Sequence, residues 1–322
     1  MRNYLEGKWN SIPKLALIIG LIFGVVATNV WLHLWGILSI PPLATWNWQI
    51  VAQRIATFGT GIAAIIAATA TLHNGYKKRE QDKESALRDR LTTIVELLAE
   101  TENLSKREAG AYALAALADD WAAFYKGNLD AAQKEQQTCL NILTGQLRDP
   151  ILDASNISVE TIHFKERIQE IIFSRFREDN LNKQGKWSNL RLDVSHCHLY
   201  NLLADGIFNQ QVSFFKTHFH KKADFSGAHF YDVTWFDEAH FHDDAGFDEA
   251  HFHDEVTFEK SIFHNAWFRK ARFYNSGKFR GAHFRNDANF KETFFYEDAV
   301  FIGARFYRNA VFSSAFFKKD AQ

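Results

Sequence analysis

Histidine is the residue type whose spacing in this chain could support chemistry. Four histidines follow one another closely, at His240, His242, His251 and His253. Read along the chain, they look like a metal cluster, because imidazole is the commonest metal ligand in proteins. Whether these side chains meet depends on the fold of the segment that carries them.

The sequence lacks the cysteine spacings and catalytic motifs that would indicate other kinds of chemistry. The two cysteines, Cys139 and Cys197, do not have a metal-ligand spacing, and a pair cannot build a disulfide framework. The sequence has no glycine-rich phosphate loop, no H-E-x-x-H pair and no nucleophile motif. We therefore expect no enzymatic activity and no catalytic residues. The formal net charge of −1 also argues against a dedicated nucleic-acid binder.

The last third of the chain carries an internal repeat. From Phe208 to Phe317, 21 of the 24 phenylalanines stand five or six residues apart, each with a small residue two places before it. Side chains alternate along an extended segment, so these two residues point to the same side. The repeat predicts a solenoid filled with phenylalanine. Leu192, Cys197 and Leu202 extend the phase towards the N-terminus.

The steps between phenylalanines set the length of a coil. From Phe214 onwards, fives and sixes alternate and give a 22-residue coil, and the alternation fails once, between Phe263 and Phe268. The expected structural core consists of Phe225, Phe230, Phe236, Phe241, Phe247, Phe252, Phe258, Phe263, Phe268, Phe273, Phe279, Phe284, Phe290, Phe295, Phe301, Phe306 and Phe312.

This register predicts which histidines meet. An offset of eleven residues is half a coil, so the pair His240 and His242 should point away from the pair His251 and His253. The expected columns are His220, His242 and His264; His229 and His251; and an aromatic ladder of Tyr231, His253, Tyr274 and Tyr296. Imidazoles stacked about 4.8 Å apart could share a transition metal or titrate together. No tetrahedral ligand set is evident, so we expect no metal and no cofactor.

Charge is also patterned along the repeat. Residues 223–259 hold eleven acidic residues and no lysine or arginine, whereas residues 260–291 hold eight basic residues and one acidic residue. A bipolar surface that docks a partner or anionic lipid is one interpretation. Pairing between neighbouring coils is the other, and the register favours it. The residues expected to stack are Lys216, Glu238 and Lys260; Asp248 and Arg269; and Glu249 and Lys270.

The N-terminal residues, 1–76, predict a transmembrane hairpin. No charged residue lies between Lys14 and Arg54, and apolar runs at about 15–36 and 50–72 have the length that a bilayer demands. Lysine and arginine precede the first run and follow the second. The positive-inside rule then places both termini and the repeat domain in the cytoplasm.

Residues 77–186 predict an amphipathic stalk and a small α-helical domain. Leu87, Leu91, Ile94 and Leu98 recur at three- and four-residue steps, as in a helix with a narrow apolar stripe. The spacing of apolar residues and the breaks between them predict further helices at about 107–124, 131–147 and 158–177.

Three segments carry a resemblance to a known family: the helix sequence at 107–119, the segment at 139–143 and the repeat entry at 187–193. With the two apolar runs, the whole chain resembles membrane-anchored bacterial pentapeptide-repeat proteins. The resemblance implies a right-handed quadrilateral β-helix (a β-solenoid) over residues 187–322, with four faces and about six coils. The expected fold class is a membrane-anchored α+β chain with a two-helix transmembrane hairpin, a small cytoplasmic helical domain and this solenoid.

We therefore expect a membrane-tethered, non-enzymatic scaffold in the bacterial plasma membrane, whose solenoid binds an unidentified protein partner and whose hairpin contacts the bilayer. Assembly of several copies of the chain into a homo-oligomer is a further alternative. An alternative is a regulatory subunit of another membrane protein. A DNA-mimicking topoisomerase-binding protein is less favoured, because the acidic stretch stops at Glu259. The candidate surface comprises Glu238, Lys260, Asp248, Arg269, His220, His242 and His264.

Overall fold

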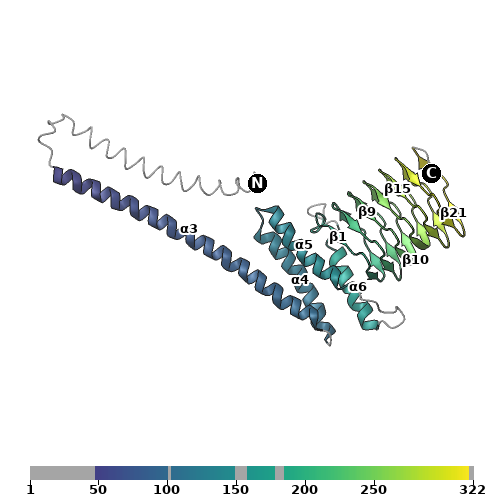
Figure 1. Ribbon diagram of the computed structural model, residues 1–322, viewed down its shortest axis with the longest axis horizontal. Helices are drawn as coiled ribbons and strands as arrows, with labels where there is room; N and C mark the ends of the chain where they lie inside the picture. The colour runs from purple at the N-terminus through teal and green to yellow at the C-terminus, as the bar shows by residue number, and fades with distance from the viewer. Residues whose placement is uncertain (1–47, 101–102, 149–157, 178–184, 319–322) are drawn as a thin grey trace. The chain divides into compact units, whose positions relative to one another are not determined.

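The computed structural model describes residues 48–100, 103–148, 158–177 and 185–318 (Figure 1). The chain divides into two compact units, residues 1–88 and residues 89–322. The predicted first membrane span, 15–36, lies outside the described residues.

The first described element is a single long helix. Helix α3 (Trp48–Ala99) runs for 52 residues and contains both the predicted second span, 50–72, and the predicted stalk, 77–100. Among the described residues, no helix combines the length and the apolar character needed to cross a membrane. The membrane hairpin therefore stays a prediction from the sequence. At the end of α3, Leu98 is buried against Gly110, which lets the two backbones approach closely.

Three shorter helices follow: α4 (Leu104–Phe124), α5 (Leu129–Gly145) and α6 (Val159–Phe173). Each begins at a side-chain cap, because the side chains of Asn103, Asn128 and Ser158 each accept a hydrogen bond from a backbone N–H three residues later. Their shared core is apolar and includes Leu114, Leu117, Trp121, Cys139, Leu140, Leu143, Ile168 and Ile172.

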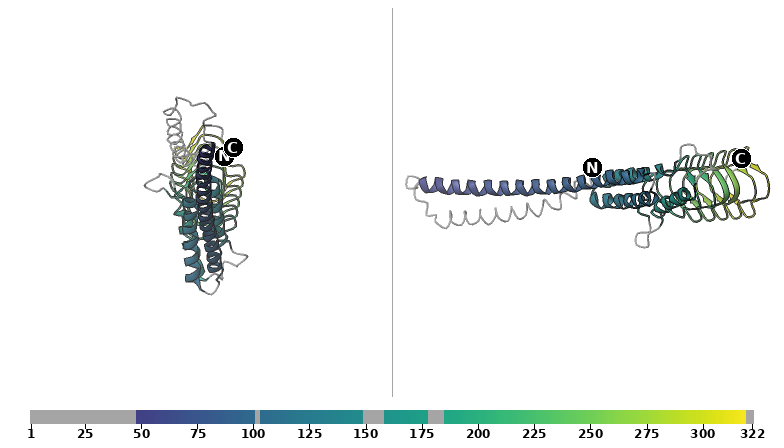
Figure 2. Two further views of the ribbon diagram at one scale, coloured as in Figure 1. Left: turned by 90° about the vertical axis from the view of Figure 1, so that its left-hand side faces the viewer. Right: turned by 90° about the horizontal axis from the view of Figure 1, so that it is seen from below.

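The rest of the described chain is a solenoid of parallel strands, whose coils stand as a row of loops in Figure 2. Sheet A contains β1 (Leu192–Asp193), β5 (Val212–Ser213), β9 (Thr234–Trp235), β12 (Val256–Thr257), β15 (Gly277–Lys278) and β19 (Ala299–Val300). Sheet B contains β2 (His198–Leu199), β6 (His218–Phe219), β10 (His240–Gly246), β13 (Ile262–Trp267), β16 (His283–Phe284) and β20 (Arg305–Phe306). Sheet C contains β4 (Ile207–Phe208), β8 (His229–Phe230), β11 (His251–Phe252), β14 (Arg272–Phe273), β18 (Phe294–Phe295) and β22 (Phe316–Phe317).

A fourth side completes each coil. It consists of β3 (Leu202–Leu203), β7 (Ala223–Asp224), β17 (Ala288–Asn289) and β21 (Ala310–Val311), with the last residues of β10 and β13 between β7 and β17. The solenoid therefore has four sides and about six coils, as the resemblance to pentapeptide-repeat proteins implies.

Phenylalanine fills the interior in four columns. Within each column, successive rings stack face to face with centroids about 5 Å apart; in sheet C, for example, Phe230 lies 5.2 Å from Phe252 and Phe252 lies 4.9 Å from Phe273. Rings of different columns meet edge to face. The predicted core phenylalanines from Phe225 to Phe295 are buried, and Phe301, Phe306 and Phe312, in the last described coil, are half-buried.

Two opposite corners of each coil use left-handed backbone. There the residue two places after an inward side chain has a positive φ. One corner column holds His196, Lys216, Glu238, Lys260, Gly281 and Gly303, and the other holds Gly227, Glu249, Lys270, Glu292 and Ser314. Because most of these residues are not glycine, the stacked coils must hold them in a conformation that costs roughly 1 kcal/mol or more.

A different corner explains the one irregular step of the repeat. Both β10 and β13 continue from sheet B into the fourth side, and their register shifts by one residue between Phe241 and Asp244. The extra residue of β10 forms a bulge there. The missing residue between Phe263 and Phe268 is thus absorbed without displacing either phenylalanine column, since both rings still stack on their neighbours.

The first coil differs from its prediction by two residues. Leu192 pairs with Val212 and Leu202 pairs with Ala223, so these leucines occupy the position of the small residue. The side chains that begin the inward columns are Val194, Leu199 and Ala204, and all are buried. The predicted phase was wrong in this coil because both positions hold apolar residues.

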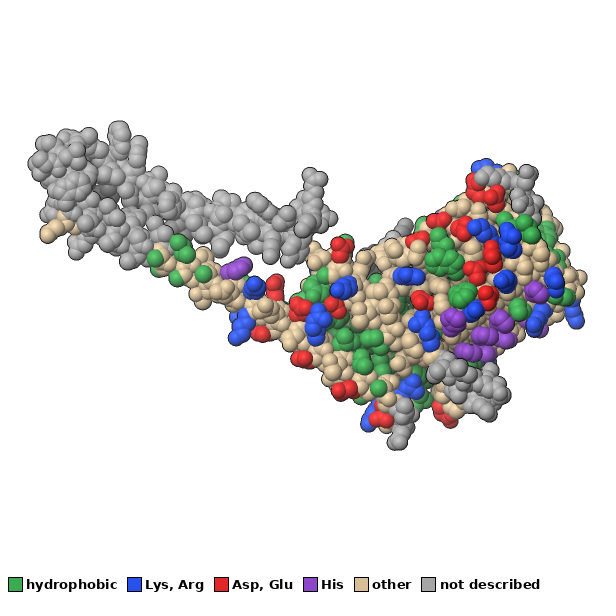
Figure 3. Space-filling model, viewed as in Figure 1, with side chains coloured by type: hydrophobic (Ala, Val, Ile, Leu, Met, Phe, Trp, Pro, Cys, Tyr) green, Lys and Arg blue, Asp and Glu red, His purple; other side chains and the backbone are tan. Residues whose placement is uncertain are grey.

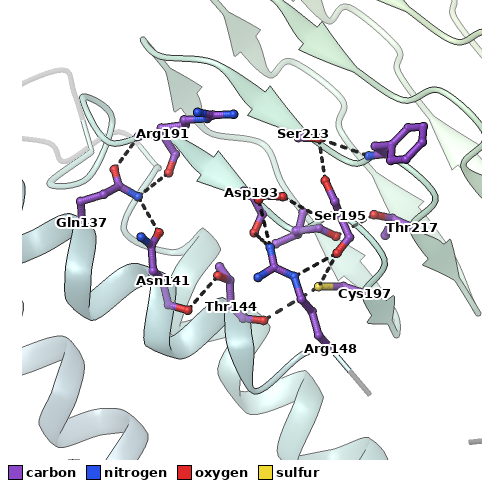
Figure 4. Close-up of polar contacts among 12 residues, drawn as sticks. Gln137, Asn141, Thr144, Arg148, Arg191, Asp193, Ser195, Cys197, Ser213 and Thr217 are labelled. Atoms are coloured by element: carbon purple, nitrogen blue, oxygen red, sulfur yellow. Dashed lines mark hydrogen bonds and ion pairs between the residues drawn. The ribbon is translucent and has the colours of Figure 1, made fainter. Parts of the chain in front are cut away.

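Helices α5 and α6 cover the N-terminal end of the solenoid through side-chain hydrogen bonds to its backbone. Figure 4 shows those of Gln137, on α5. The Gln137 amide exchanges two hydrogen bonds with the backbone of Arg191, at 2.8 and 3.0 Å. Gln169 does the same with the backbone of Tyr200, at 2.8 Å for each bond. Both glutamines thus mimic a neighbouring strand and satisfy the open edge of the first coil.

Candidate functional site

Two outward positions of each coil carry most of the histidines. They are the residue just before an inward side chain, here the preceding position, and the residue just after it, the following position. On sheet B, His198, His218 and His240 occupy preceding positions of consecutive coils, and His220 and His242 occupy following positions. Histidine side chains gather in one patch on the face of the solenoid shown in Figure 3.

One side-chain contact recurs between these positions. A preceding histidine reaches the following histidine of the next coil, with Nδ1 to Nε2 distances of 2.8 Å for His198 and His220 and 3.2 Å for His218 and His242. On sheet C, His229 reaches His253 in the same way at 3.3 Å. A tyrosine hydroxyl takes the place of the second imidazole in two further pairs, His251 with Tyr274 at 3.2 Å and His283 with Tyr307 at 3.1 Å.

Two sets of three histidines bring their ring nitrogens within 4.8 Å of one another. The triad on sheet B is His218, His240 and His242, and the triad on sheet C is His229, His251 and His253. Each triad consists of a preceding histidine and the His-Phe-His segment of the next coil. The linear cluster of four histidines is therefore divided between two sheets, as predicted, and each half gains a partner from the coil before.

Burial lowers the pKa of several of these imidazoles. Burial lowers the pKa of His218 to about 4, and the neighbouring imidazoles, that of His240 first among them, lower it in the same direction. Burial likewise lowers the pKa of His220 and of His251 to about 4, with smaller contributions from nearby imidazoles. The rings of His218, His220 and His251 are thus unprotonated near pH 7, and each has a ring nitrogen that can accept a hydrogen bond.

The predicted histidine columns are placed as follows. The rings of His220 and His242 stack with centroids 5.1 Å apart, and those of His229 and His251 stack at 4.4 Å. The ring of His264 lies beside Asn286, whose Nδ2 is 2.9 Å from Nε2 of the histidine. The preceding column of sheet B was not predicted. His-Phe-His at 218–220 and 240–242 already signals it, because both neighbours of an inward residue point outwards.

Opposite charges pair between neighbouring coils. Glu238 lies 3.4 Å from Lys216, and Asp248 forms an ion pair with Arg269. The other pairs are Glu249 with Lys270 at 3.6 Å, Glu255 with Lys278 at 2.6 Å and Glu259 with Arg280 at 3.8 Å. Lys260 follows Glu238 in the same corner column. The acidic stretch is therefore interleaved with cations and does not form a continuous anionic surface, as a DNA mimic would need.

The outer face of sheet C is aromatic. Its following positions hold a ladder of Tyr231, His253, Tyr274 and Tyr296, whose successive ring centroids are 4.1, 4.8 and 5.2 Å apart. Its preceding positions hold His229, His251, Arg272, Phe294 and Phe316. Tyr231 and Phe316 are each 47% exposed. These two columns form the aromatic face referred to below.

The cysteines have the surroundings of structural residues. Burial raises the pKa of Cys139 and of Cys197 to about 12, so neither thiol ionises near neutral pH. A cavity of about 620 Å³ beside α6 and the first coil is lined largely by charged groups. Several of these already form ion pairs, such as Arg167 with Glu170 at 3.1 Å and Arg177 with Asp205 at 2.6 Å.

Comparison with known proteins identifies the repeat. Residues 214–262, 236–280 and 279–322 match a family model described as pentapeptide repeats (9 copies). No curated protein and no solved structure matches the chain. The solenoid of the C-terminal third is thus built of pentapeptide repeats.

Proposed function

We propose that the chain is a non-enzymatic interaction module and that its solenoid binds a protein partner through the aromatic face of sheet C. Pentapeptide repeats fit this role, because proteins built from them are generally non-enzymatic and solenoids offer extended rigid surfaces. The observation that carries the proposal is the pair of aromatic columns on one sheet.

The composition of this face supports a protein partner. Tyrosine, phenylalanine and arginine are the residues enriched at the centres of protein interfaces. Here they are held rigid in advance, since each ring of the ladder stacks on its neighbours and Arg272 lies over the ring of Phe294 at 5.6 Å. A surface ordered before binding loses little side-chain entropy when a partner docks.

Site-specific photo-crosslinking tests this proposal. A photoreactive phenylalanine derivative would replace Tyr231 or Tyr274, in sheet C, or Tyr307, which is 56% exposed in sheet B, in full-length protein produced by its native cells. We expect the same cross-linked protein from both sheet C positions and none from Tyr307. Equal cross-links from all three positions, or none from sheet C, would overturn the proposal.

We also propose that the N-terminal residues tether this module to a bacterial plasma membrane, with the solenoid in the cytoplasm. The support is the sequence alone, in which residues 15–53 carry no charged side chain. A Thr45→Cys variant tests the topology, because the two native cysteines are buried. A membrane-impermeant maleimide should label this variant from outside the cell; labelling only after the membrane is opened would sink the topology.

A further inference from the structure

We propose that the solenoid holds two equivalent sites for a first-row divalent transition cation such as zinc, each made by three histidines on adjacent coils. The sites are the sheet B triad of His218, His240 and His242 and the sheet C triad of His229, His251 and His253.

The nitrogen positions suit such a cation. Two nitrogens bound to one zinc ion at about 2.0–2.1 Å with tetrahedral geometry lie about 3.3–3.4 Å apart. Nδ1 of His218 lies 3.2 Å from Nε2 of His242, and Nδ1 of His229 lies 3.3 Å from Nε2 of His253. In each triad one ring nitrogen from each of the three histidines lies within 4.8 Å of the other two, so side-chain rotation can bring the three nitrogens around one ion.

The two triads have similar spacings between their rings, although the ring of His240 is tilted more than that of His251. In the sheet B triad, the ring centroids of His218 lie 4.7 Å from those of His240 and 5.5 Å from those of His242. The corresponding distances in the sheet C triad are 4.4 and 5.6 Å, and the two rings of each His-Phe-His segment are 6.0 Å apart. The repeat therefore builds one ligand set twice, on scaffolds fixed by ladder hydrogen bonds.

Each triad offers one ring nitrogen from each of three imidazoles. Three imidazoles leave a fourth coordination position for water or for a carboxylate. A hydrogen bond between two imidazoles explains one pair in each triad, but it does not explain why a third histidine recurs at the same place.

Zinc titration of the full-length chain without a histidine tag, followed by calorimetry, tests the proposal. The wild-type chain should bind two zinc ions, and the His218→Asn and His229→Asn variants one each. The double variant should bind neither. His283→Asn is the matched control, because His283 occupies the same column of sheet B but belongs to neither triad; it should still bind two ions.

A second measurement keeps the test independent of folding in the variants. In the wild-type chain loaded with Cu²⁺, the nitrogen hyperfine pattern in electron paramagnetic resonance should report three imidazole nitrogens per ion. Saturable binding that the double variant retains, equal loss in His283→Asn, no binding by the wild-type chain, or a pattern of fewer than three nitrogens would each overturn the proposal.

Discussion

The replacement Phe252→Ala tests whether ring stacking holds the solenoid together. Phe252 is 1% exposed, and its ring stacks on those of Phe230 and Phe273 with centroids 5.2 and 4.9 Å away. It also meets Phe258 edge to face at 6.2 Å. Removing the ring therefore opens a void in the middle of one column and leaves two rings without one of their neighbours.

The magnitude follows from these contacts. Burying a phenylalanine side chain is worth about 1.5–3 kcal/mol, and each aromatic pair adds about 0.5–1.5 kcal/mol. With two stacked neighbours, the loss should be roughly 3–5 kcal/mol, which is the range for buried phenylalanine replaced by alanine. Neighbouring coils cannot collapse into the void, because backbone hydrogen bonds such as that from Tyr274 N–H to the Phe252 carbonyl, 2.9 Å long, fix their spacing.

Urea unfolding of the full-length chain, followed by circular dichroism, measures this loss. The control is Phe316→Ala, in the same sheet, because Phe316 points outwards and is 47% exposed; we expect it to cost less than about 1 kcal/mol. Equal effects of the two replacements would refute the assignment of stability to the stacked interior.

Three further predictions concern the glutamine contacts of α5 and α6, the histidine His218 and the left-handed corner at Gly227. Gln169→Leu should destabilise the chain by roughly 1–3 kcal/mol, because both hydrogen bonds of Gln169 to the backbone of Tyr200 are buried. Gln137→Leu removes the same contact at a solvent-accessible position and should cost less than about 1 kcal/mol. Equal losses of stability in urea unfolding would contradict this prediction. The folded-state pKa of His218, about 4, lies below its ordinary value of 6.5, so its contribution to stability is present above about pH 6.5 and is lost as the pH falls towards 4. The His218→Asn variant should therefore show a flatter pH dependence of the urea unfolding midpoint between about pH 4 and 6.5. An unchanged slope would contradict this prediction. Gly227→Ala should cost about 1 kcal/mol in thermal unfolding although the new methyl group meets no atom within 4 Å, because its φ is +69°; no loss would show that the corner relaxes.

The repeat could be predicted from the sequence wherever its signal was unambiguous. Phe208 and every later inward residue is phenylalanine, so the period fixes the columns and the stacking of side chains such as Tyr231 on His253. In the first coil the signal is ambiguous, because Leu192 and Val194 are both apolar and both buried. Periodicity alone cannot then distinguish the small-residue position from the inward one.

The predicted register did not reveal the glutamine contacts of α5 and α6 or the two histidine triads, and the reasons differ. Gln137 and Gln169 are ordinary polar residues on helices, and nothing in their spacing says that they bond to a strand edge far away in the sequence. His240 and His242, in contrast, were recognised as a pair, but only His242 was assigned to a column, with His220 and His264. Their meeting with His218 needs the diagonal contact between coils, which depends on side-chain rotation as well as on register.

The corner that β10 and β13 run through has a consequence for how such a chain can change length. One coil there holds a residue more than the next, yet the phenylalanines on either side, such as Phe241 and Phe263, remain in contact at 4.7 Å. Single-residue insertions and deletions at this corner are thus neutral for the columns, whereas the left-handed corners at Glu238 and Glu249 fix the backbone. This corner is the natural place for the repeat to acquire loops in evolution, and for an engineer to graft a peptide without disturbing the core.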